Sequence, residues 1–220
     1  MTEAGYTLWA VFRRSTSGAV AGDVDAAHLG TTLDALGESG VTVRGVYDVS
    51  GMRADADVLF WLTGSDPAAL QSALRRIRRT ALIAPLLPRW SAMGVHREAE
   101  FNRSHVPGFL RGEPARGWLA VYPFVRSLDW YVLPEEDRSR MLAEHGRRGA
   151  AYRSVIANTV AAFALGDYEW ILPMESDELT DLVDMMRDLR GVEARLHVRE
   201  EVPFFTGRRI ELREIAEVLS

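Results

Sequence analysis

The chain has 220 residues, of which 47% are hydrophobic and 26% are charged, and its formal net charge is −5. It contains no cysteine and no lysine, which excludes disulfides, thiolate metal sites, cysteine nucleophiles, a lysine Schiff base and a P-loop with its lysine. The acidic balance argues against a nucleic acid as the main partner, no apolar run is long enough for a membrane span, and the N-terminus does not resemble a secretory signal, so we expect a cytoplasmic protein.

The first hundred residues predict an α+β module. Residues 6–13 read YTLWAVFR and predict a strand, because their apolar side chains cluster as in a half-buried strand. Asp66 followed by Pro67 is typical of a helix start, and leucines at helical spacing come directly after it. The other predicted elements are a helix over 24–36 and strands over 41–49, 56–63 and about 90–97.

The same order of elements recurs from residue 117. A strand, a serine–aspartate pair and an amphipathic helix follow one another in DVLFWLTGSDPAALQSALRRI and again in DYEWILPMESDELTDLVDMMRDL. The predicted elements are strands over 117–124, 167–174 and 192–200, a long helix from about Pro134, and a helix over 178–189 opened by Ser176 and Asp177. We therefore predict a duplicated α+β unit, with modules at 1–100 and 117–220 and a connector or lid, rich in Pro, Gly and Arg, at 101–116.

His145 lies in the unusual stretch MLAEHGRRGAAY, residues 141–152. Two glycines follow the histidine in a pattern that otherwise predicts a helix, although glycine inside a helix costs about 1 kcal/mol relative to alanine. On a helix, His145 and Gly149 share one face with apolar side chains, which would suit a large flat ligand close to the backbone. The alternative is a buried structural histidine, with Gly146 ending one helix before a second begins.

Tyr122, Arg126 and His145 fall within 24 residues of one another. They would supply an oxidisable phenol, a carboxylate clamp and a metal ligand. The ordinary reading is that Tyr122 and the nearby Trp130 are core aromatics at the end of a strand. The motifs of dinucleotide-binding, Walker-type, serine-hydrolase and zinc-protease sites do not occur in the sequence.

Three segments carry a resemblance to a known family: VYPFVRSLDWYVLPEEDRSRMLAEHGRRG, NTVAAFALGDYEW and REEVPFFTGRR. Together they resemble the coproheme decarboxylase branch of the chlorite dismutase superfamily, in particular its actinobacterial group. The resemblance implies two ferredoxin-like α+β modules in a dimeric α+β barrel, with antiparallel sheets and helices on one face. It also implies a ring of five subunits, with haem bound in the second module.

The resemblance also implies roles for individual residues. His145 would be the proximal iron ligand, Tyr122 the phenol that becomes a radical, and His105 a distal base for peroxide. Arg126 would lie near a propionate. The implied pocket further includes Trp130, Trp170, Asn158, where chlorite dismutases carry a distal arginine, and Gly149, which would give the porphyrin clearance. Arg111, Arg208 and Arg209 are further candidates for binding carboxylates, or are solvated surface charges.

The implied reaction is hydrogen peroxide-dependent decarboxylation of two propionates of Fe-coproporphyrin III (coproheme), which yields haem b. Coproheme would then be both substrate and cofactor, and a ferrochelatase is a candidate transient partner. Asn158 in place of an arginine makes chlorite breakdown a poor expectation. The alternatives are a haem carrier without turnover, a chlorite dismutase-like or peroxidase haem enzyme, and a ferredoxin-like monooxygenase without a cofactor.

Overall fold

The computed structural model describes residues 5–15, 26–97 and 106–220. The chain forms two compact units: unit 1 consists of Met1–Val95 with Phe205–Ser220, and unit 2 of His96–Phe204. This division differs from the predicted module at 117–220, because the last 16 residues belong with the N-terminal ones. The reason is strand pairing: β10 (Phe205–Ile210) runs antiparallel to β2 (Val41–Asp48) and extends the sheet of unit 1.

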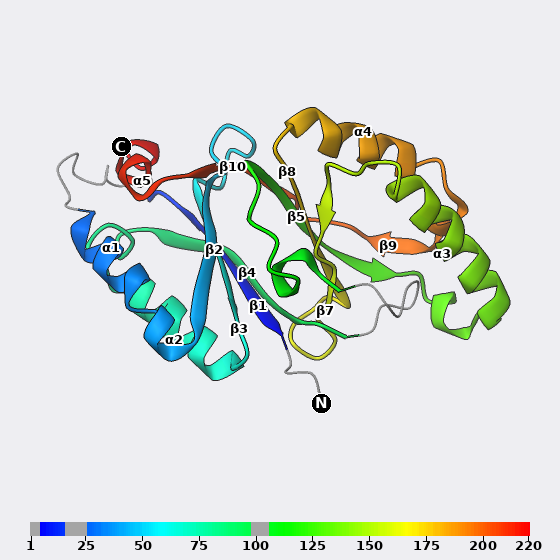
Figure 1. The fold of residues 1–220 in the computed structure, drawn as a ribbon, viewed down its shortest axis with the longest axis horizontal. Helices are drawn as coiled ribbons and strands as arrows, with labels where there is room; N and C mark the ends of the chain where they lie inside the picture. The colour runs from blue at the N-terminus through cyan, green and yellow to red at the C-terminus, as the bar shows by residue number, and fades with distance from the viewer. Residues whose placement is uncertain (1–4, 16–25, 98–105) are drawn as a thin grey trace. The chain divides into compact units, whose positions relative to one another are not determined.

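Unit 1 is a five-stranded antiparallel sheet with helices (Figure 1). The order of its strands is β4-β1-β3-β2-β10, and its first four strands in the order 4-1-3-2 are the pattern of a ferredoxin-like module. The predicted strands and the helix start at Pro67 are confirmed, and Asp66 accepts a hydrogen bond from the Ala68 amide at 2.9 Å as the N-cap. The remaining elements are β1 (Tyr6–Arg13), α1 (Ala27–Asp34), η1 (Gly37–Ser39), β3 (Val58–Gly64), α2 (Pro67–Arg78), β4 (Leu87–Val95) and α5 (Leu212–Val218).

The helices of unit 1 pack on one face of its sheet. Alternate residues of β1 and β3 point toward them, as period-two side-chain alternation requires. The space between helices and sheet is filled by aliphatic and aromatic side chains, among them Leu8, Phe60, Leu62, Leu70, Ile77 and Ile215. Unit 1 therefore has a closed apolar core.

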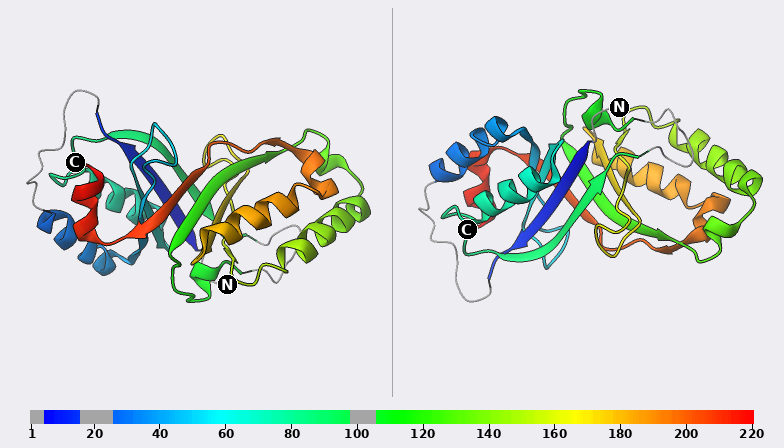
Figure 2. Two further views of the ribbon diagram at one scale, coloured as in Figure 1. Left: turned by 90° about the horizontal axis from the view of Figure 1, so that it is seen from above. Right: turned by 90° about the horizontal axis from the view of Figure 1, so that it is seen from below.

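Unit 2 repeats the alternation of strands and helices. Its strand β5 (Trp118–Arg126) pairs antiparallel with β8 (Trp170–Ser176) and with β9 (Val198–Glu200). Helix α3 (Glu135–Gly149) lies beside α4 (Leu179–Leu189), as both views of Figure 2 show. The shorter elements are η2 (Gly108–Leu110), η3 (Trp130–Val132), β6 (Ile156–Ala157), β7 (Val160–Ala161) and η4 (Glu193–His197).

Two local predictions for unit 2 differ from the structure, and one alternative is excluded. Helix α3 continues through Gly146, which confirms the long helix and excludes the alternative in which Gly146 ends it. The predicted strand over 192–200 is instead the 3₁₀ helix η4 followed by the short strand β9, because Val192 and Ala194 turn inward to pack beside Met141 and Leu142. Helix α4 begins after Glu178, while Ser176 Oγ accepts a hydrogen bond from the Glu178 amide at 3.2 Å.

The first two residues of the predicted helix over 24–36 and residues 101–105 of the predicted connector lie outside the described residues. Of the connector, residues 106–116 are described and contain only the short turn η2. Among the helices that the structure describes, none combines the length and the apolar character needed to cross a lipid bilayer.

Candidate functional site

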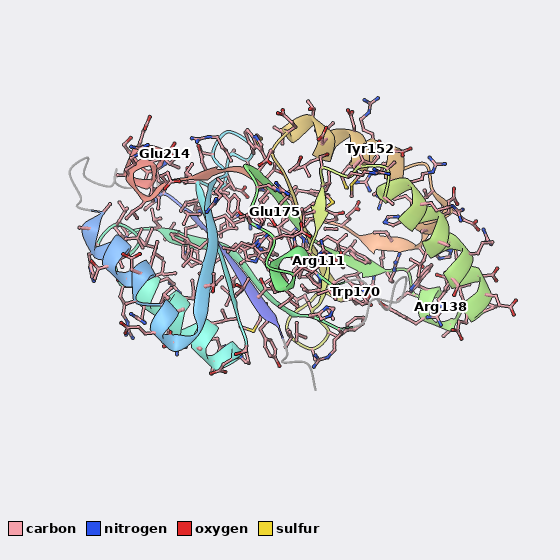
Figure 3. The ribbon with its side chains drawn as sticks, viewed as in Figure 1. Arg111, Arg138, Tyr152, Trp170, Glu175 and Glu214 are labelled. Atoms are coloured by element: carbon pink, nitrogen blue, oxygen red, sulfur yellow. The ribbon has the colours of Figure 1, made fainter. Side chains whose placement is uncertain are left out.

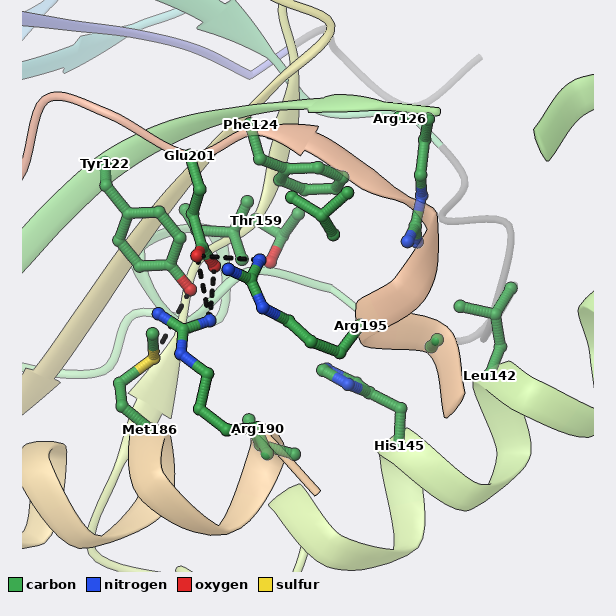
Figure 4. A pocket seen from close by; sticks show the side chains of 14 residues that line it. Tyr122, Phe124, Arg126, Leu142, His145, Thr159, Met186, Arg190, Arg195 and Glu201 are labelled. Carbon is green, nitrogen blue, oxygen red and sulfur yellow. Dashed lines mark hydrogen bonds and ion pairs between the residues drawn. The ribbon is translucent and has the colours of Figure 1, made fainter. Parts of the chain in front are cut away.

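A pocket in unit 2 opens between the strand β5 and the helices α3 and α4 (Figure 4). Its cavity volume is about 90 Å³, and the cavity is open to solvent on one side. The lining is mostly apolar with a few placed polar groups, as is typical of small-molecule sites. The residues that line it are Tyr122, Phe124, Arg126, Leu142, His145, Thr159, Leu172, Met186, Leu189, Arg190, Ala194, Arg195, Val198 and Glu201.

Strand β5 supplies three of the lining side chains. Tyr122, Phe124 and Arg126 are separated by two residues each, so they project from the same face of the strand. The register with β8 pairs Tyr122 with Leu172 and Phe124 with Trp170, which fixes how far along the sheet each side chain stands. The spacing of Tyr122 and Arg126 in the sequence is therefore what brings both into one pocket.

His145 enters the pocket from the opposite wall. It lies on α3 three residues after Leu142, on the same side of the helix, and its ring points into the pocket in Figure 4. Burial lowers the pKa of His145 below its usual value of about 6.5, and the positive charge of Arg126 lowers it further. The imidazole is therefore neutral near pH 7, which is the form that binds a metal ion.

Tyr122 is buried and stays protonated. Its hydroxyl donates to Met186 Sδ at 3.5 Å, and its ring stacks on Phe204 with centroids 4.2 Å apart. Burial raises the pKa of Tyr122 well above its usual range, and the charge of Glu201 adds to this, while Arg190 and Arg195 act in the opposite direction. The phenol can therefore give up an electron only if its proton leaves as well.

Arg126 is held over two aromatic rings. Its guanidinium carbon lies 4.1 Å from the centroid of Trp130 and 4.9 Å from that of Phe124, a cation–π arrangement. Trp130 is fully buried and does not itself line the pocket; its ring also lies near that of His197, with centroids 5.3 Å apart. Trp130 thus packs against Arg126 and helps to hold its side chain in place.

The pocket also contains a charged group that the sequence did not predict. Glu201 lies between Arg190 and Arg195: its carboxylate is 2.8 Å from Arg190 Nη1 and 2.9 Å from Arg195 Nη1. With Arg126, the lining holds three arginines and one glutamate, which leaves two net positive charges when His145 is neutral. The pocket is therefore positive inside a chain whose net charge is −5. The run of arginine and glutamate residues after the predicted helix over 178–189 could have indicated this group. It did not, because residues 192–200 were predicted to form a strand.

The other predicted site residues lie elsewhere in unit 2. Trp170 is behind Phe124, with ring centroids 6.3 Å apart, and its Nε1 donates to the Tyr131 hydroxyl at 3.1 Å. Asn158 is fully buried; its Oδ1 accepts from the Phe109 amide at 3.0 Å. Its Nδ2 donates to Glu175 at 3.1 Å; Figure 3 labels Trp170 and Glu175.

Gly149 is the last residue of α3, and His105 lies outside the described residues. A Cβ added at Gly146 or Gly149 would meet no other described atom within 4 Å. Close packing of the described chain therefore does not explain why either position is glycine.

The remaining arginine candidates do not line this pocket. Arg111 donates from its Nε to Glu113 at 2.8 Å. Arg208, in unit 1, pairs with Glu214 at 3.0 Å and sits in the same strand β10 as Arg209. The structure thus joins Tyr122, Arg126 and His145, and adds Arg190, Arg195 and Glu201 to them.

Comparisons with known proteins point in one direction. A family model described as chlorite dismutase matches residues 24–210. The coproheme decarboxylase of Mycolicibacterium smegmatis is 53% identical over 186 residues, covering 84% of this chain and 80% of that protein. The coproheme decarboxylase of Thermus thermophilus is 26% identical over 188 residues, covering 80% and 75%. A variant of chlorite dismutase from Candidatus Nitrospira defluvii shares the fold, with a TM-score of 0.83 and 21% identity over 97% of this chain and 94% of that one.

Proposed function

Because this chain belongs to the chlorite dismutase family, we propose that it is a coproheme decarboxylase that completes haem b by oxidative loss of two propionate carboxyl groups. The proposal takes its substrate from the relative that is 53% identical. The pocket of unit 2 is where we place the substrate, and the cytoplasm is where we expect the enzyme to act.

The residues of the pocket fit an iron porphyrin that carries carboxylates. A single neutral imidazole, His145, is a common axial ligand for porphyrin iron. The two net positive charges of the lining offset part of the negative charge of four propionates, and arginine binds carboxylates in two-point contacts. Leu142, Leu172 and Leu189 give the macrocycle apolar surface. We propose that His145 holds the iron and Arg126 a propionate.

The reaction balances with one hydrogen peroxide for each propionate. A propionate, one peroxide and one proton become a vinyl group, carbon dioxide and two waters, so peroxide accepts two electrons. The iron of the substrate supplies the activation of peroxide. We assign the protein's own part to Tyr122, which loses an electron and a proton and becomes a phenoxyl radical.

The phenoxyl group then takes a hydrogen atom from the propionate carbon next to the ring, which restores the phenol. Loss of carbon dioxide and of a second electron leaves the vinyl group. The raised pKa of Tyr122 favours the protonated phenol between cycles, so the residue is ready for the second propionate. Tyr122 is the catalytic residue of this scheme. Its phenol in the pocket is the observation that favours an enzyme over a simple haem carrier.

Other roles stay part of the proposal. We assign His105 to deprotonating peroxide, which a neutral histidine does near pH 7. Trp130 and Trp170 act through the groups they support, Arg126 and Phe124. Asn158 and Gly149 are assigned to shaping the cavity and to clearance. A ring of five subunits and delivery of coproheme by a ferrochelatase complete the proposal.

The observation that carries the proposal is one pocket that joins a buried tyrosine, a neutral histidine and a surplus of arginine. The test is titration of the coproheme complex with hydrogen peroxide, followed by mass spectrometry. We expect two successive losses of carbon dioxide with two hydrogen atoms, through a species with three propionates. A bound porphyrin whose mass does not change would mark a carrier, and no porphyrin binding would reject the haem assignment.

A further inference from the structure

Among the described residues that line the pocket, Glu201 is the one acidic side chain, and it faces two arginines. Arg190 Nη1 donates to its Oε1 at 3.0 Å, and Arg195 Nη1 lies 2.9 Å from its Oε2. Figure 4 shows the carboxylate between the two guanidinium groups, with the hydroxyl of Tyr122 nearby. One carboxylate therefore shares two arginines at the place where the proposed chemistry needs a substrate carboxylate.

The contacts of Glu201 leave the arginines incompletely satisfied. Arg195 Nη1 is buried and makes no hydrogen bond of good geometry to any described residue, despite its short distance to Glu201. A guanidinium group has five N–H donors and binds a carboxylate best through two parallel hydrogen bonds. The pair of arginines has donors and charge to spare for a second carboxylate, or for one that is better placed.

The position of Glu201 also allows its side chain to move away from the two arginines. It lies in coil between β9 and β10, outside the strand pairing that holds its neighbours. Its side chain is 15% exposed, against 42% for Arg190 and 35% for Arg195, so the cluster borders solvent. Exchange of one carboxylate for another is inexpensive there, because the arginines keep a negative partner and no buried charge is left unpaired.

We propose that Arg190 and Arg195 form the binding site for the propionate on which Tyr122 acts, and that Glu201 occupies this site while no porphyrin is bound. The proposal rests on the proposed function. The propionate displaces Glu201 when coproheme enters, and its own carboxyl group then lies beside the phenol. When that group leaves as carbon dioxide, the arginines lose their partner and Glu201 returns. The site thus favours substrate, which has the carboxyl group, over product, which lacks it.

Binding of metal-free porphyrins tests this without any turnover. Coproporphyrin III has the reactive propionates, and protoporphyrin IX has vinyl groups in their place. In Glu201→Gln the competing charge is gone, so coproporphyrin III should bind about tenfold more tightly, because the site is no longer partly occupied from within. Protoporphyrin IX should bind within about twofold of the wild type, since it presents no carboxylate there. Quenching of tryptophan fluorescence measures both affinities.

Glu193→Gln is the matched control. Glu193 also pairs with an arginine, Arg140, at 2.6 Å, but both side chains are exposed and neither lines the pocket. This variant should bind both porphyrins as the wild type does. An equal gain for coproporphyrin III in both variants would mean a general charge effect and would overturn the proposal, as would unchanged or weaker binding in Glu201→Gln, or an equal change for both porphyrins.

A second variant decides the question if Glu201→Gln does not fold. Arg195→Gln should weaken binding of coproporphyrin III about tenfold and leave protoporphyrin IX unchanged, whereas equal effects on the two porphyrins would remove Arg195 from the site. The proposed function fails separately: a wild type that binds coproporphyrin III but never releases carbon dioxide from coproheme is no decarboxylase. The affinities for the two porphyrins would still decide whether Glu201 occupies a binding site for a carboxylate.

Discussion

Unit 1 and unit 2 place helices against antiparallel strands in the same order, but they fill the space between the two layers differently. In unit 1, Leu70 and Ile77 of α2 pack directly on Phe60 and Leu62 of β3. In unit 2, the space between α3, α4 and β5 holds His145 from α3 and Tyr122 and Arg126 from β5, around an open pocket. A ferredoxin-like unit thus gains an open pocket when polar side chains replace aliphatic ones at inward-facing positions.

Helices α2 and α3 are held in place by different contacts. Helix α2 packs on the sheet of unit 1. Helix α3 is held from the side, where Met141 and Leu142 pack on Val192, Ala194 and Trp130. A helix with its own lateral anchor can stand away from the sheet without losing its apolar contacts, and this leaves room for a ligand. The 3₁₀ helix η4 supplies that anchor and also carries Arg195 into the pocket.

The largest expected effect is that of Tyr122→Phe, a substitution in the pocket of unit 2. We expect turnover of coproheme to fall at least about a thousandfold, because phenylalanine has no hydroxyl to oxidise, while coproheme binds as before. Peroxide titration with mass spectrometry measures the loss. The control is Tyr152→Phe, since Tyr152 donates to the Asp184 carbonyl at 3.2 Å outside the pocket lining. Turnover that persists in Tyr122→Phe would contradict the radical assignment.

Paired core truncations should show that one unit is closed and the other open. Leu70→Ala in unit 1 should lower the free energy of unfolding by about 3 kcal/mol, because it leaves a cavity in a filled core. Leu142→Ala should cost about 2 kcal/mol, the lower end of the range for a buried leucine, because that side chain also borders the pocket and its removal costs fewer contacts. Urea unfolding measures both. Equal losses would mean that the pocket of unit 2 closes when no ligand is bound.

His145→Ala should separate metal binding from porphyrin binding. We expect the affinity for coproheme to fall about a hundredfold, because the iron loses its protein ligand. The affinity for metal-free coproporphyrin III should change by less than about threefold, since the carboxylate contacts remain. Absorption titrations report both, and His28→Ala, an exposed histidine of unit 1, is the control. A similar loss with both porphyrins would show that His145 shapes the pocket rather than ligating iron.

The sequence predicted the parts of the site that depend on local spacing. The two-residue period of β5 puts Tyr122 and Arg126 on one face, and the helical period of α3 puts His145 beside Leu142. It did not predict the cluster of Arg190, Arg195 and Glu201. Arg195 lies in η4, with Arg190 before it and Glu201 after it in the chain. The inward residues of this segment are selected by packing against α3, a contact between segments about fifty residues apart.

The same distinction explains the misplaced end of the chain. Strand β10 joins unit 1 because Arg209 and Ile210 pair with Tyr47 and Val46. No local pattern in residues 205–220 indicates that partner, because strand pairing is decided by register and tertiary context. The local elements were predictable here, while the choice of distant partners was not.

The smallest effect concerns the charge that Arg126 brings to His145. In the folded protein the pKa of His145 is below its unfolded value of about 6.5, first through burial and then through Arg126. Below pH 6.5 the unfolded chain therefore binds more protons, so this contribution to the stability of the ligand-free protein is complete above that pH and is lost as the pH falls.

In Arg126→Gln the pKa of His145 should rise part of the way back, because burial remains, and the loss of stability in acid should shrink. Histidine proton NMR against pH measures the pKa, and Arg140→Gln, at an exposed ion pair, is the control. An unmoved or lower pKa in Arg126→Gln would show that Arg126 does not act on His145, and the pocket would then owe its neutral imidazole to burial alone.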